Sequence, residues 1–440
     1  LWFFSIFVFI NAFNFQHNPP GGWQQQQMPD IRSLTIRDLT FADSLNGYAI
    51  ASKYVNPDTS MILKTTNGGE NWEIIFNQAR IRMSRVIFLN NSTGFVSGGT
   101  GSGTPYLLKT TNGGSSWIYI DVPGINFLDD ISVFNENTIW IVDDNGFNGG
   151  LFRTTNGGQN WELQYGGGLG GTKPNRVYFY DGKFGWAGEN NFFSQFLLKT
   201  TNSGLNWIQV PGQNGFKKIC FIDTLNGWKT RGDTMKFTSD GGSNWTNQSL
   251  QSGGNITSSF MLDFSIAGGD TIWGIGGYVY SGSNARAILH YSTNGGSSWL
   301  YQIPDTSGGT FNFVNFISTK IGWAYGIDRN GIHTATGGGP VFLGIKQISA
   351  EIPQNFHLHQ NYPNPFNPTT KIRFELNRSE EVRLEVYDIS GRRVSGLLNR
   401  HLPAGIYEYT FDGRDLASGV YFYSLTTQEK KITRKMVFAK

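Results

Sequence analysis

The chain has 440 residues, of which 57 are glycine, 15% are charged and 15% are aromatic. This composition suits many short strands joined by tight turns, and the length excludes a single ordinary β-sandwich. The formal net charge of +3 is near balance, so the sequence offers no basis for binding nucleic acid. The one cysteine, Cys220, excludes an intrachain disulfide, and the apolar stretch around it favours a buried hydrophobe over a reactive thiol.

The first residues form an apolar run, "LWFFSIFVFINAF", which is too short to cross a bilayer. Such a run is typical of the hydrophobic region of a secretory signal peptide. We expect a signal peptide at residues 1–15, clipped at its start and cleaved near Ala12. A retained amphipathic or buried segment is the alternative. We expect no transmembrane segment in the mature chain.

A ten-residue unit recurs six times, and its first copy, "LKTTNGGENW", ends at Trp72. An Asn or Asp side chain accepts bonds from nearby backbone N–H groups, Gly accepts the positive φ that closes a turn, and Trp offers a large packing surface. Each unit is therefore interpreted as a structural hairpin turn. The turn and packing residues are Asn67, Trp72, Asn112, Trp117, Asn156, Trp161, Asn202, Trp207, Asp240, Trp245, Asn294 and Trp299.

A second motif alternates with the first and consists of an apolar strand, a turn and an aromatic residue, as in "RVYFYDGKFGWAGE". It occurs seven times, and the tryptophans that end the first motif are 45, 44, 46, 38 and 54 residues apart. That period is typical of a four-stranded propeller blade. The sequence thus predicts an all-β protein in which residues 16–342 form a seven-bladed β-propeller.

The missing seventh copy of the first motif indicates how the ring closes. Trp23 is followed six residues later by Pro29, as Trp117 is followed by Pro123. We therefore predict that residues 22–28 supply the outer strand of the last blade, which removes the open edges of the ring. A disordered Gln-rich leader is the alternative.

The "TTNGGxxW" units resemble Asp-box (BNR-type) repeats. With "GW" or "GWA" after the inner strand, they are most similar to the Ycf48-like, photosystem II assembly factor type of propeller. This resemblance covers residues 22–342 and implies boxes on the hairpins between the two outer strands, away from the usual ligand face. Asp-box propellers include sialidases, xyloglucan hydrolases, sorting receptors and assembly factors, so the ligand stays open. Only Asp240 keeps the acid of the box.

From Ile352 the composition changes, and alternating strands such as Ile372, Phe374 and Leu376 predict a small Ig-like β-sandwich at residues 356–440, after a linker at 343–355. "YPNPFNPTT", "VYDISGRRV", "LPAGIYEYTFDGRDLASGVYFYSL" and "KKITRKMVFAK" closely resemble the type A C-terminal sorting domain of the type IX secretion system. The resemblance implies a Gram-negative, Bacteroidetes-like bacterium, the type IX machinery as partner, and release or attachment to surface lipopolysaccharide. An Ig-like module retained for binding is the alternative.

Catalytic residues of a propeller enzyme would lie on the loops at the mouth of its axial channel. A glycoside hydrolase needs two carboxylates about 5 to 10 Å apart. A sialidase-like site needs arginines around a carboxylate and an activated tyrosine, but no Tyr/Glu pair is evident. Solvated loop acids are the simpler interpretation of the five weak candidates, Asp143, Asp144, Glu189, Asp233 and Asp328.

Aromatic and basic residues on the same loops are candidates for ligand binding, because exposed rings stack on sugars or anchor peptides, although such rings also pack against neighbouring loops. They are Tyr54, Tyr106, Phe192, Phe193, Arg231, Tyr278, Tyr280, Arg286 and Arg329. The six histidines are scattered, so we expect no metal and no cofactor. We predict a secreted or cell-surface, non-enzymatic binding module for a protein or glycan. A glycoside hydrolase using loop carboxylates and a Ycf48-like assembly factor are the alternatives.

Overall fold

The computed structural model describes residues 22–31, 33–53, 59–122, 124–143, 149–166, 172–190, 195–250, 256–281, 284–304, 310–338, 343–349, 351–413 and 416–439. The predicted signal peptide at residues 1–15 lies outside these ranges. Every regular element within them is a β-strand, which confirms the predicted all-β class.

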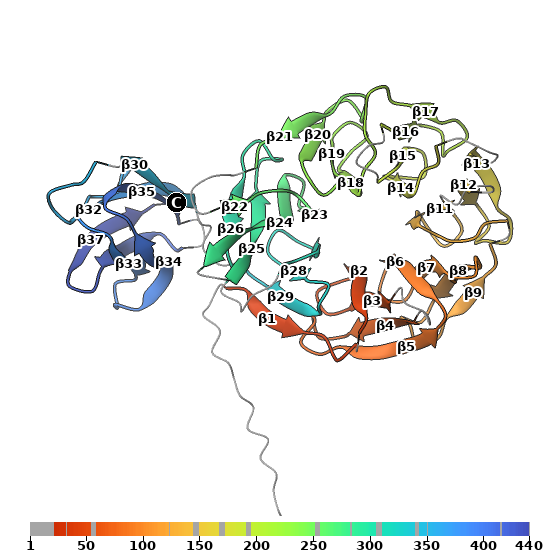
Figure 1. Cartoon of the computed structure of the whole chain (residues 1–440), viewed down its shortest axis with the longest axis horizontal. Helices are drawn as coiled ribbons and strands as arrows, with labels where there is room; N and C mark the ends of the chain where they lie inside the picture. Colours follow the sequence, from red (N-terminus) through yellow and green to blue (C-terminus); the bar gives the residue numbers. More distant parts are fainter. Residues whose placement is uncertain are drawn as a thin grey trace, which may run out of the picture.

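The described residues between 22 and 338 form seven antiparallel sheets arranged in a ring (Figure 1). From inner to outer strand, the first three are β2 (Thr35–Phe41), β3 (Gly47–Lys53), β4 (Thr59–Thr65) and β5 (Glu73–Ala79); β6 (Arg82–Phe88), β7 (Gly94–Gly99), β8 (Pro105–Thr110) and β9 (Ile118–Ile120); and β10 (Asp130–Val133), β11 (Ile139–Asp143), β12 (Gly150–Thr154) and β13 (Glu162–Gly166). The fourth and fifth are β14 (Arg176–Phe179), β15 (Gly185–Gly188), β16 (Leu197–Thr200) and β17 (Ile208–Gln209); and β18 (Lys218–Phe221), β19 (Gly227–Thr230), β20 (Met235–Thr238) and β21 (Thr246–Gln248).

The sixth sheet is longer than the others because its central hairpin is extended. It contains β23 (Asp263–Ala267), β24 (Thr271–Ser281), β25 (Asn284–Ser292) and β26 (Leu300–Gln302), and β22 (Ile256–Ser258) pairs with the far end of β24. The seventh sheet contains β27 (Phe313–Phe316), β28 (Gly322–Tyr325), β29 (Asn330–Thr334) and β1 (Gln24–Gln27).

Strand β1 closes the ring, as the sequence predicts for residues 22–28. It pairs antiparallel with β29, from Gln24 opposite His333 to Gln27 opposite Asn330. The ring of Trp23 meets Phe316 edge to face at 6.1 Å. Strand β1 therefore belongs to the sheet of the last blade, although the other three strands of that sheet come from residues 313–334 (Figure 1).

Aromatic stacking between neighbouring sheets forms the core of the ring. Trp140 stacks on Phe179 of the next sheet at 3.6 Å, and Trp323 of the seventh sheet stacks on Phe41 of the first at the same distance. In the second motif a Gly precedes the aromatic residue because another ring packs closely against its backbone. A Cβ at Gly185, for example, would lie 2.5 Å from the Phe179 ring. Each blade thus buries its apolar surface against its neighbours.

The repeated ten-residue units form hairpin turns between the third and fourth strands of their sheets. In the first, Thr65 Oγ1 accepts the Gly69 N–H at 2.9 Å, and Asn67 Oδ1 accepts the Asn71 N–H at 3.0 Å. Gly69 has a φ of 89°, which a residue with a Cβ would adopt only under strain. The same pattern holds at Asp240, whose Oδ1 accepts a backbone N–H at 2.9 Å.

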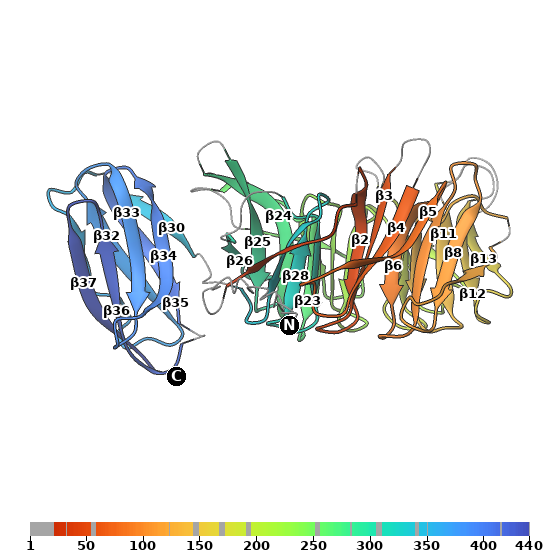
Figure 2. The same ribbon diagram turned by 90° about the horizontal axis from the view of Figure 1, so that it is seen from below.

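The tail is a sandwich of two four-stranded sheets (Figure 2). One contains β30 (Leu343–Ser349), β35 (Gly405–Asp412), β32 (Thr369–Leu376) and β31 (His357–Leu358), and the other contains β34 (Arg393–Leu402), β33 (Glu380–Tyr387), β36 (Gly419–Thr426) and β37 (Lys431–Phe438). Alternate residues such as Ile372 and Phe374 are fully buried between the sheets. The segment 343–355, predicted as a linker, contains β30, which pairs with β35 and so contributes a strand to the sandwich.

Gln26 should be the residue of β1 on which ring closure most depends. Its Nε2 donates to the Gly68 carbonyl at 2.9 Å, and its Oε1 accepts the hydroxyl of Tyr325 at 2.6 Å. Replacing it in Gln26→Leu leaves the buried tyrosine hydroxyl without its acceptor, so we expect the free energy of unfolding to fall by about 1–3 kcal/mol. Denaturation of the full chain, followed by tryptophan fluorescence, measures this.

Gln25→Leu is the matched control, because Gln25 lies in the same strand and is exposed. Its effect should stay within about 0.5 kcal/mol. Equal effects of the two substitutions would show that β1 contributes no specific polar contact to the closure.

Candidate functional site

The acidic residues that the sequence offers as catalytic candidates are dispersed and largely engaged. Asp143 is only 1% exposed, and its Oδ2 accepts a backbone N–H at 2.8 Å. Asp233 pairs with Arg231 at 3.7 Å, while Asp328 is exposed and accepts a neighbouring asparagine side chain at 2.8 Å. Glu189 follows β15 and is half-buried. No contact in the described residues brings two of these acids together.

The binding candidates that fall on described residues also make protein contacts. The Tyr106 hydroxyl donates to Gln78 at 2.8 Å, Arg329 pairs with Asp30 at 3.1 Å, and Arg286 donates to the Pro304 carbonyl. Tyr278 lies in β24 and is half-buried. Four candidates, Tyr54, Asp144, Phe192 and Phe193, lie outside the described residues, and so does the side chain of Tyr280.

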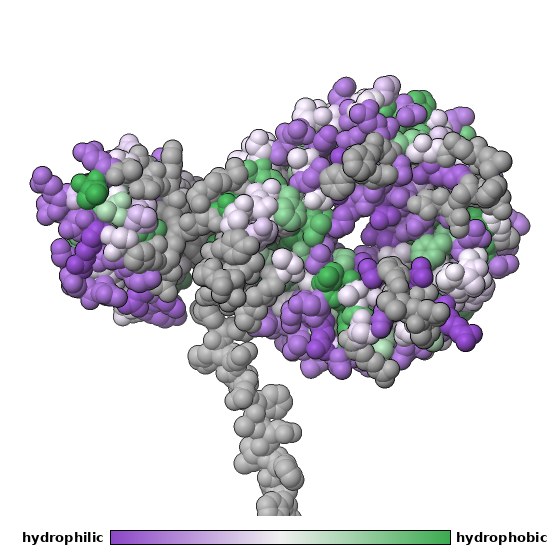
Figure 3. Space-filling model, viewed as in Figure 1, coloured by the Kyte–Doolittle hydropathy of each residue, from purple (hydrophilic) through white to green (hydrophobic). Residues whose placement is uncertain are grey.

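Charged residues occupy one register position on the inner strands of six sheets. Most copies of the inner-strand motif end in Phe. The charged residue stands three positions before that end. Figure 3 shows an opening through the centre of the ring, around which the inner strands stand in Figure 1. The position is held by Asp38 on β2, Arg85 on β6, Asp130 on β10, Arg176 on β14, Lys218 on β18 and Asp263 on β23, whereas β27 has Phe313 there. We call these residues the channel ring.

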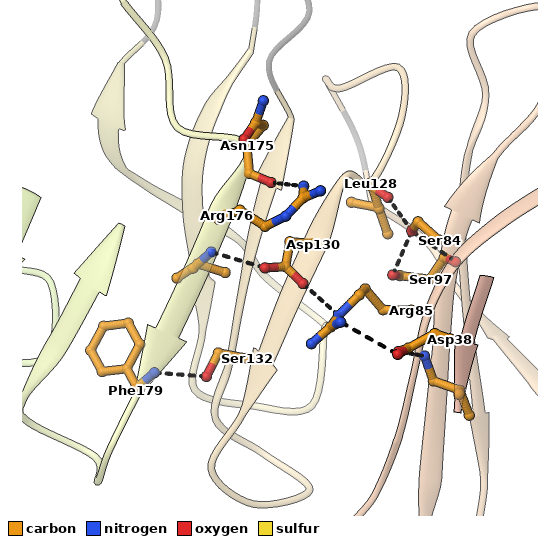
Figure 4. Close-up of polar contacts among 12 residues, drawn as sticks. Asp38, Ser84, Arg85, Ser97, Leu128, Asp130, Ser132, Asn175, Arg176 and Phe179 are labelled. Atoms are coloured by element: carbon orange, nitrogen blue, oxygen red, sulfur yellow. Dashed lines mark hydrogen bonds and ion pairs between the residues drawn. The ribbon is translucent and has the colours of Figure 1, made fainter. Parts of the chain in front are cut away.

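Two ion-paired groups account for most of the channel ring. Arg85 lies between two aspartates (Figure 4), with its Nε 2.8 Å from Asp130 Oδ1 and its Nη1 3.5 Å from Asp38 Oδ1. Lys218 Nζ lies 2.8 Å from Asp263 Oδ1. The three carboxylates of the channel ring are therefore all ion-paired, and they share two cations.

Each of these aspartates also binds the backbone of the next inner strand. Their second carboxylate oxygens accept the N–H of Val86 at 2.9 Å, of Val177 at 3.1 Å and of Val314 at 3.0 Å, for Asp38, Asp130 and Asp263 respectively. Such bonds hold a carboxylate in place as an acceptor, so these acids are structural parts of the ring.

The groups of the channel ring act on one another across the opening. Burial raises the pKa of Asp38, against the opposing charges of Arg85 and Lys218. Burial disfavours the charged form of Arg85, but Asp38, Asp130 and Asp263 outweigh it and hold the pKa of Arg85 above its ordinary value. Arg85 is on the second sheet and Asp263 on the sixth, so side chains from opposite sides of the ring face a common space.

Two cations remain without a carboxylate partner among the described residues. Arg176 Nη1 donates to the backbone carbonyl of Asn175 at 2.6 Å (Figure 4), and Lys217, just before β18, makes no ion pair there. Burial lowers the pKa of Lys217, and nearby cations, including Lys218 and Arg176, lower it further, whereas Asp263 opposes the shift. The described part of the ring thus has an excess of positive charge beside Arg176 and Lys217.

The sequence contained a signal for this site, but a search of loops alone misses it. The segments "RDLTF", "SRVIF", "NRVYF" and "KKICF" each place a charged residue at the same position of the inner-strand motif. In a repeat protein, residues at the same motif position lie next to one another in space. An alignment of the seven copies would therefore have shown that acidic and basic residues share this position.

No group of histidine, cysteine or carboxylate side chains suited to a metal ion occurs in the described ranges. Cys220 lies within β18 and is partly buried, and burial raises the pKa of its thiol. Among the described residues, no helix is long and apolar enough to cross a membrane.

Arg85→Met should destabilise the propeller because it leaves two carboxylates of the ring without their cation. The Arg85 side chain is 39% exposed, so we expect a loss of about 2–4 kcal/mol at pH 7, below the cost of breaking a fully buried pair. Without Arg85 the already raised pKa of Asp38 rises further, and the protonated acid tolerates burial. The deficit should therefore shrink as the pH falls towards 4, which denaturation at several pH values measures.

Lys109→Met is the control, because Lys109 pairs at 2.8 Å with Glu136, a carboxylate that is 49% exposed. Its loss should cost less than about 1 kcal/mol. A deficit of Arg85→Met that did not change with pH would contradict the role assigned to the carboxylates.

Family comparisons match the two parts of the chain separately. The model described as "Photosynthesis system II assembly factor YCF48" matches residues 17–332, and that described as "Secretion system C-terminal sorting domain" matches residues 360–439. A search of curated proteins found no match.

Solved structures share the propeller fold. "YCF48 bound to D1 peptide" is 20% identical, covers 73% of this chain and 98% of its own, and has a TM-score of 0.51. YCF48 from Cyanidioschyzon merolae is 20% identical over 71% of this chain and 98% of its own, with a TM-score of 0.50. The GH74 xyloglucanase from Xanthomonas campestris is 10% identical over 94% and 68%, with a TM-score of 0.53. Because the first family model spans well over half of the chain, the protein belongs to the photosystem II assembly factor YCF48 family, with a secretion-system sorting domain as its tail.

Proposed function

We propose that the protein is a non-enzymatic binding module that takes an acidic segment of a protein partner at Arg176 and Lys217. The sorting domain indicates export by the type IX system of a Bacteroidetes-type bacterium, so the partner is met outside the cell or at its surface, with the protein released or attached there. The observation that carries the proposal is the pair of cations without a carboxylate partner among the described residues.

An acidic peptide suits this site on electrostatic grounds. A carboxylate beside Arg176 would form a charge-assisted hydrogen bond. It would also oppose the effects of burial and of the neighbouring cations, which together lower the pKa of Lys217. Folding has already removed water from around Lys217, so the free energy of binding does not include that desolvation again. A YCF48 structure with a bound D1 peptide supports a peptide as the class of ligand for a propeller of this family.

The hydrolase alternative receives less support from the described residues. Glycoside hydrolysis needs one carboxylate free to transfer a proton and another free to attack or to activate water. In the channel ring, Asp38 and Asp130 share Arg85 and also accept backbone N–H groups. Their engagement in inter-blade contacts leaves them poorly suited to either role. A Ycf48-like assembly factor is compatible with the proposal, because a YCF48 structure contains a bound peptide.

Binding of a short, fluorescent Asp/Glu-rich peptide to the full chain tests the proposal. The double variant Arg176→Gln, Lys217→Gln should bind about 10- to 100-fold more weakly, which corresponds to the loss of two charge-assisted contacts. Affinity for the wild-type chain should also fall with added salt. A neutral peptide of equal length should not bind.

Lys183→Gln is the control, because Lys183 is an exposed cation on the turn between β14 and β15. It should bind the peptide as the wild type does. Equal weakening by the control and the double variant would reduce the effect to overall charge and refute the site. Release of reducing sugar from a polysaccharide by the wild-type chain would favour the hydrolase instead.

A further inference from the structure

The sorting domain holds an exposed aromatic and proline-rich loop in a fixed position. The loop covers residues 362–368, in which Tyr362 is 78% exposed and its neighbours Pro363, Asn364 and Pro365 are exposed as well. A large aromatic residue at this exposure gains nothing from burial in its own fold. The ring is therefore open to a partner, and what distinguishes it from other exposed apolar side chains of the sandwich is the fixed loop that holds it.

Buried polar contacts fix the base of this loop. Asn361 is 2% exposed, and its N–H donates to the Tyr423 hydroxyl at 2.8 Å. Its Nδ2 donates to the Pro363 carbonyl at 3.1 Å and to Thr370 Oγ1 at 2.9 Å, and Thr370 donates to the same carbonyl at 2.7 Å. Both ends of the loop are thus tied to each other, which limits the entropy that a partner must remove on binding.

The last strand of the chain holds the other side of the loop. Asn364 Oδ1 accepts the Val437 N–H at 2.8 Å, and the Phe366 N–H donates to the Val437 carbonyl at 3.0 Å. The Ala439 N–H donates back to the Phe366 carbonyl at 3.1 Å, and Phe366 packs on Phe438 with ring centroids 5.0 Å apart. The loop and the end of β37 therefore form one surface that exists only when the tail is folded.

A positive charge lies on the strand that supports this surface. Lys435 is exposed on β37, and its carbonyl accepts the Gln360 side chain at 2.7 Å, next to the start of the loop. The tail as a whole is basic, since residues 343–440 contain 14 Lys and Arg against 10 Asp and Glu, a difference of +4. The partner should accordingly combine an apolar groove with acidic groups at its edge.

We propose that Tyr362, Pro363 and Pro365, flanked by Lys435, form the surface by which the folded tail docks on a component of the secretion machinery. The partner is assigned to that machinery because the loop and Lys435 both lie within residues 360–439, which match the sorting domain of a secretion system. The tyrosine ring is the anchor that fills the apolar groove, in the manner of an interface hot spot. This assignment concerns export and is independent of the ligand of the propeller.

Export of the full chain with Tyr362→Ser, in a host with an intact type IX system, tests the proposal. Immunoblots of culture medium, cell surface and periplasm measure the distribution. We expect at least a fivefold fall in the exported fraction with accumulation in the periplasm. Thermal unfolding of the purified variant should match the wild type, because the replaced ring is exposed.

Two further variants make the outcome decisive. Ile389→Ser removes an apolar side chain that is 77% exposed on another turn of the same sandwich, and it should be exported normally. Tyr362→Phe keeps the ring and should also be exported normally. Normal export of Tyr362→Ser, or an equal defect in Ile389→Ser or Tyr362→Phe, would overturn the assignment of the aromatic ring as the docking anchor.

Discussion

One kind of contact recurs around the propeller and joins most inner strands to the next. A side chain of one inner strand accepts a backbone N–H of its neighbour, as when Ser132 accepts the Phe179 N–H at 3.0 Å and Ser265 that of Phe316 at 2.9 Å. Asn315 makes the closing contact with Phe41 at 3.3 Å, between the seventh and first sheets. Inner strands have a free edge, so these bonds satisfy donors that a separate blade would leave unpaired.

This constraint determines the chemistry available in the channel. Aspartate suits the inter-blade contact because its two oxygens serve two donors at once: one of Asp130 meets Arg85, and the other meets a backbone N–H. A carboxylate committed in this way is unsuited to proton transfer, whereas a cation at the same position has no acceptor role to fill. The inter-blade contacts therefore engage the acids of the ring, whereas Arg176 has no carboxylate partner among the described residues.

The sequence predicts the ring and its closure because both depend on local patterns. Turn chemistry identifies the hairpins, and the spacing of Trp23 and Pro29 identifies β1. Two features were not predicted from the sequence, namely strand β30 and the channel ring. Strand β30 lies in a segment without a clear alternating pattern, and it becomes a strand only because β35 offers it a pairing edge. The channel ring was not predicted because functional residues were sought only on loops, whereas Asp38 and Arg85 lie in inner strands.

The position of Arg176, which has no carboxylate partner among the described residues, follows from the order of charges around the channel ring. Phe313 holds the position on β27, so six charged positions remain, three acidic and three basic. The remaining order from β2 to β23 is acid, base, acid, base, base, acid, so Arg85 lies between two acids and Lys218 meets the last one. The acid next to Arg176 in this order is Asp130, which already pairs with Arg85. Lys217 is a further cation near Arg176. The break in alternation falls between the neighbouring inner strands β14 and β18, where no carboxylate of the described residues pairs with Arg176 or Lys217.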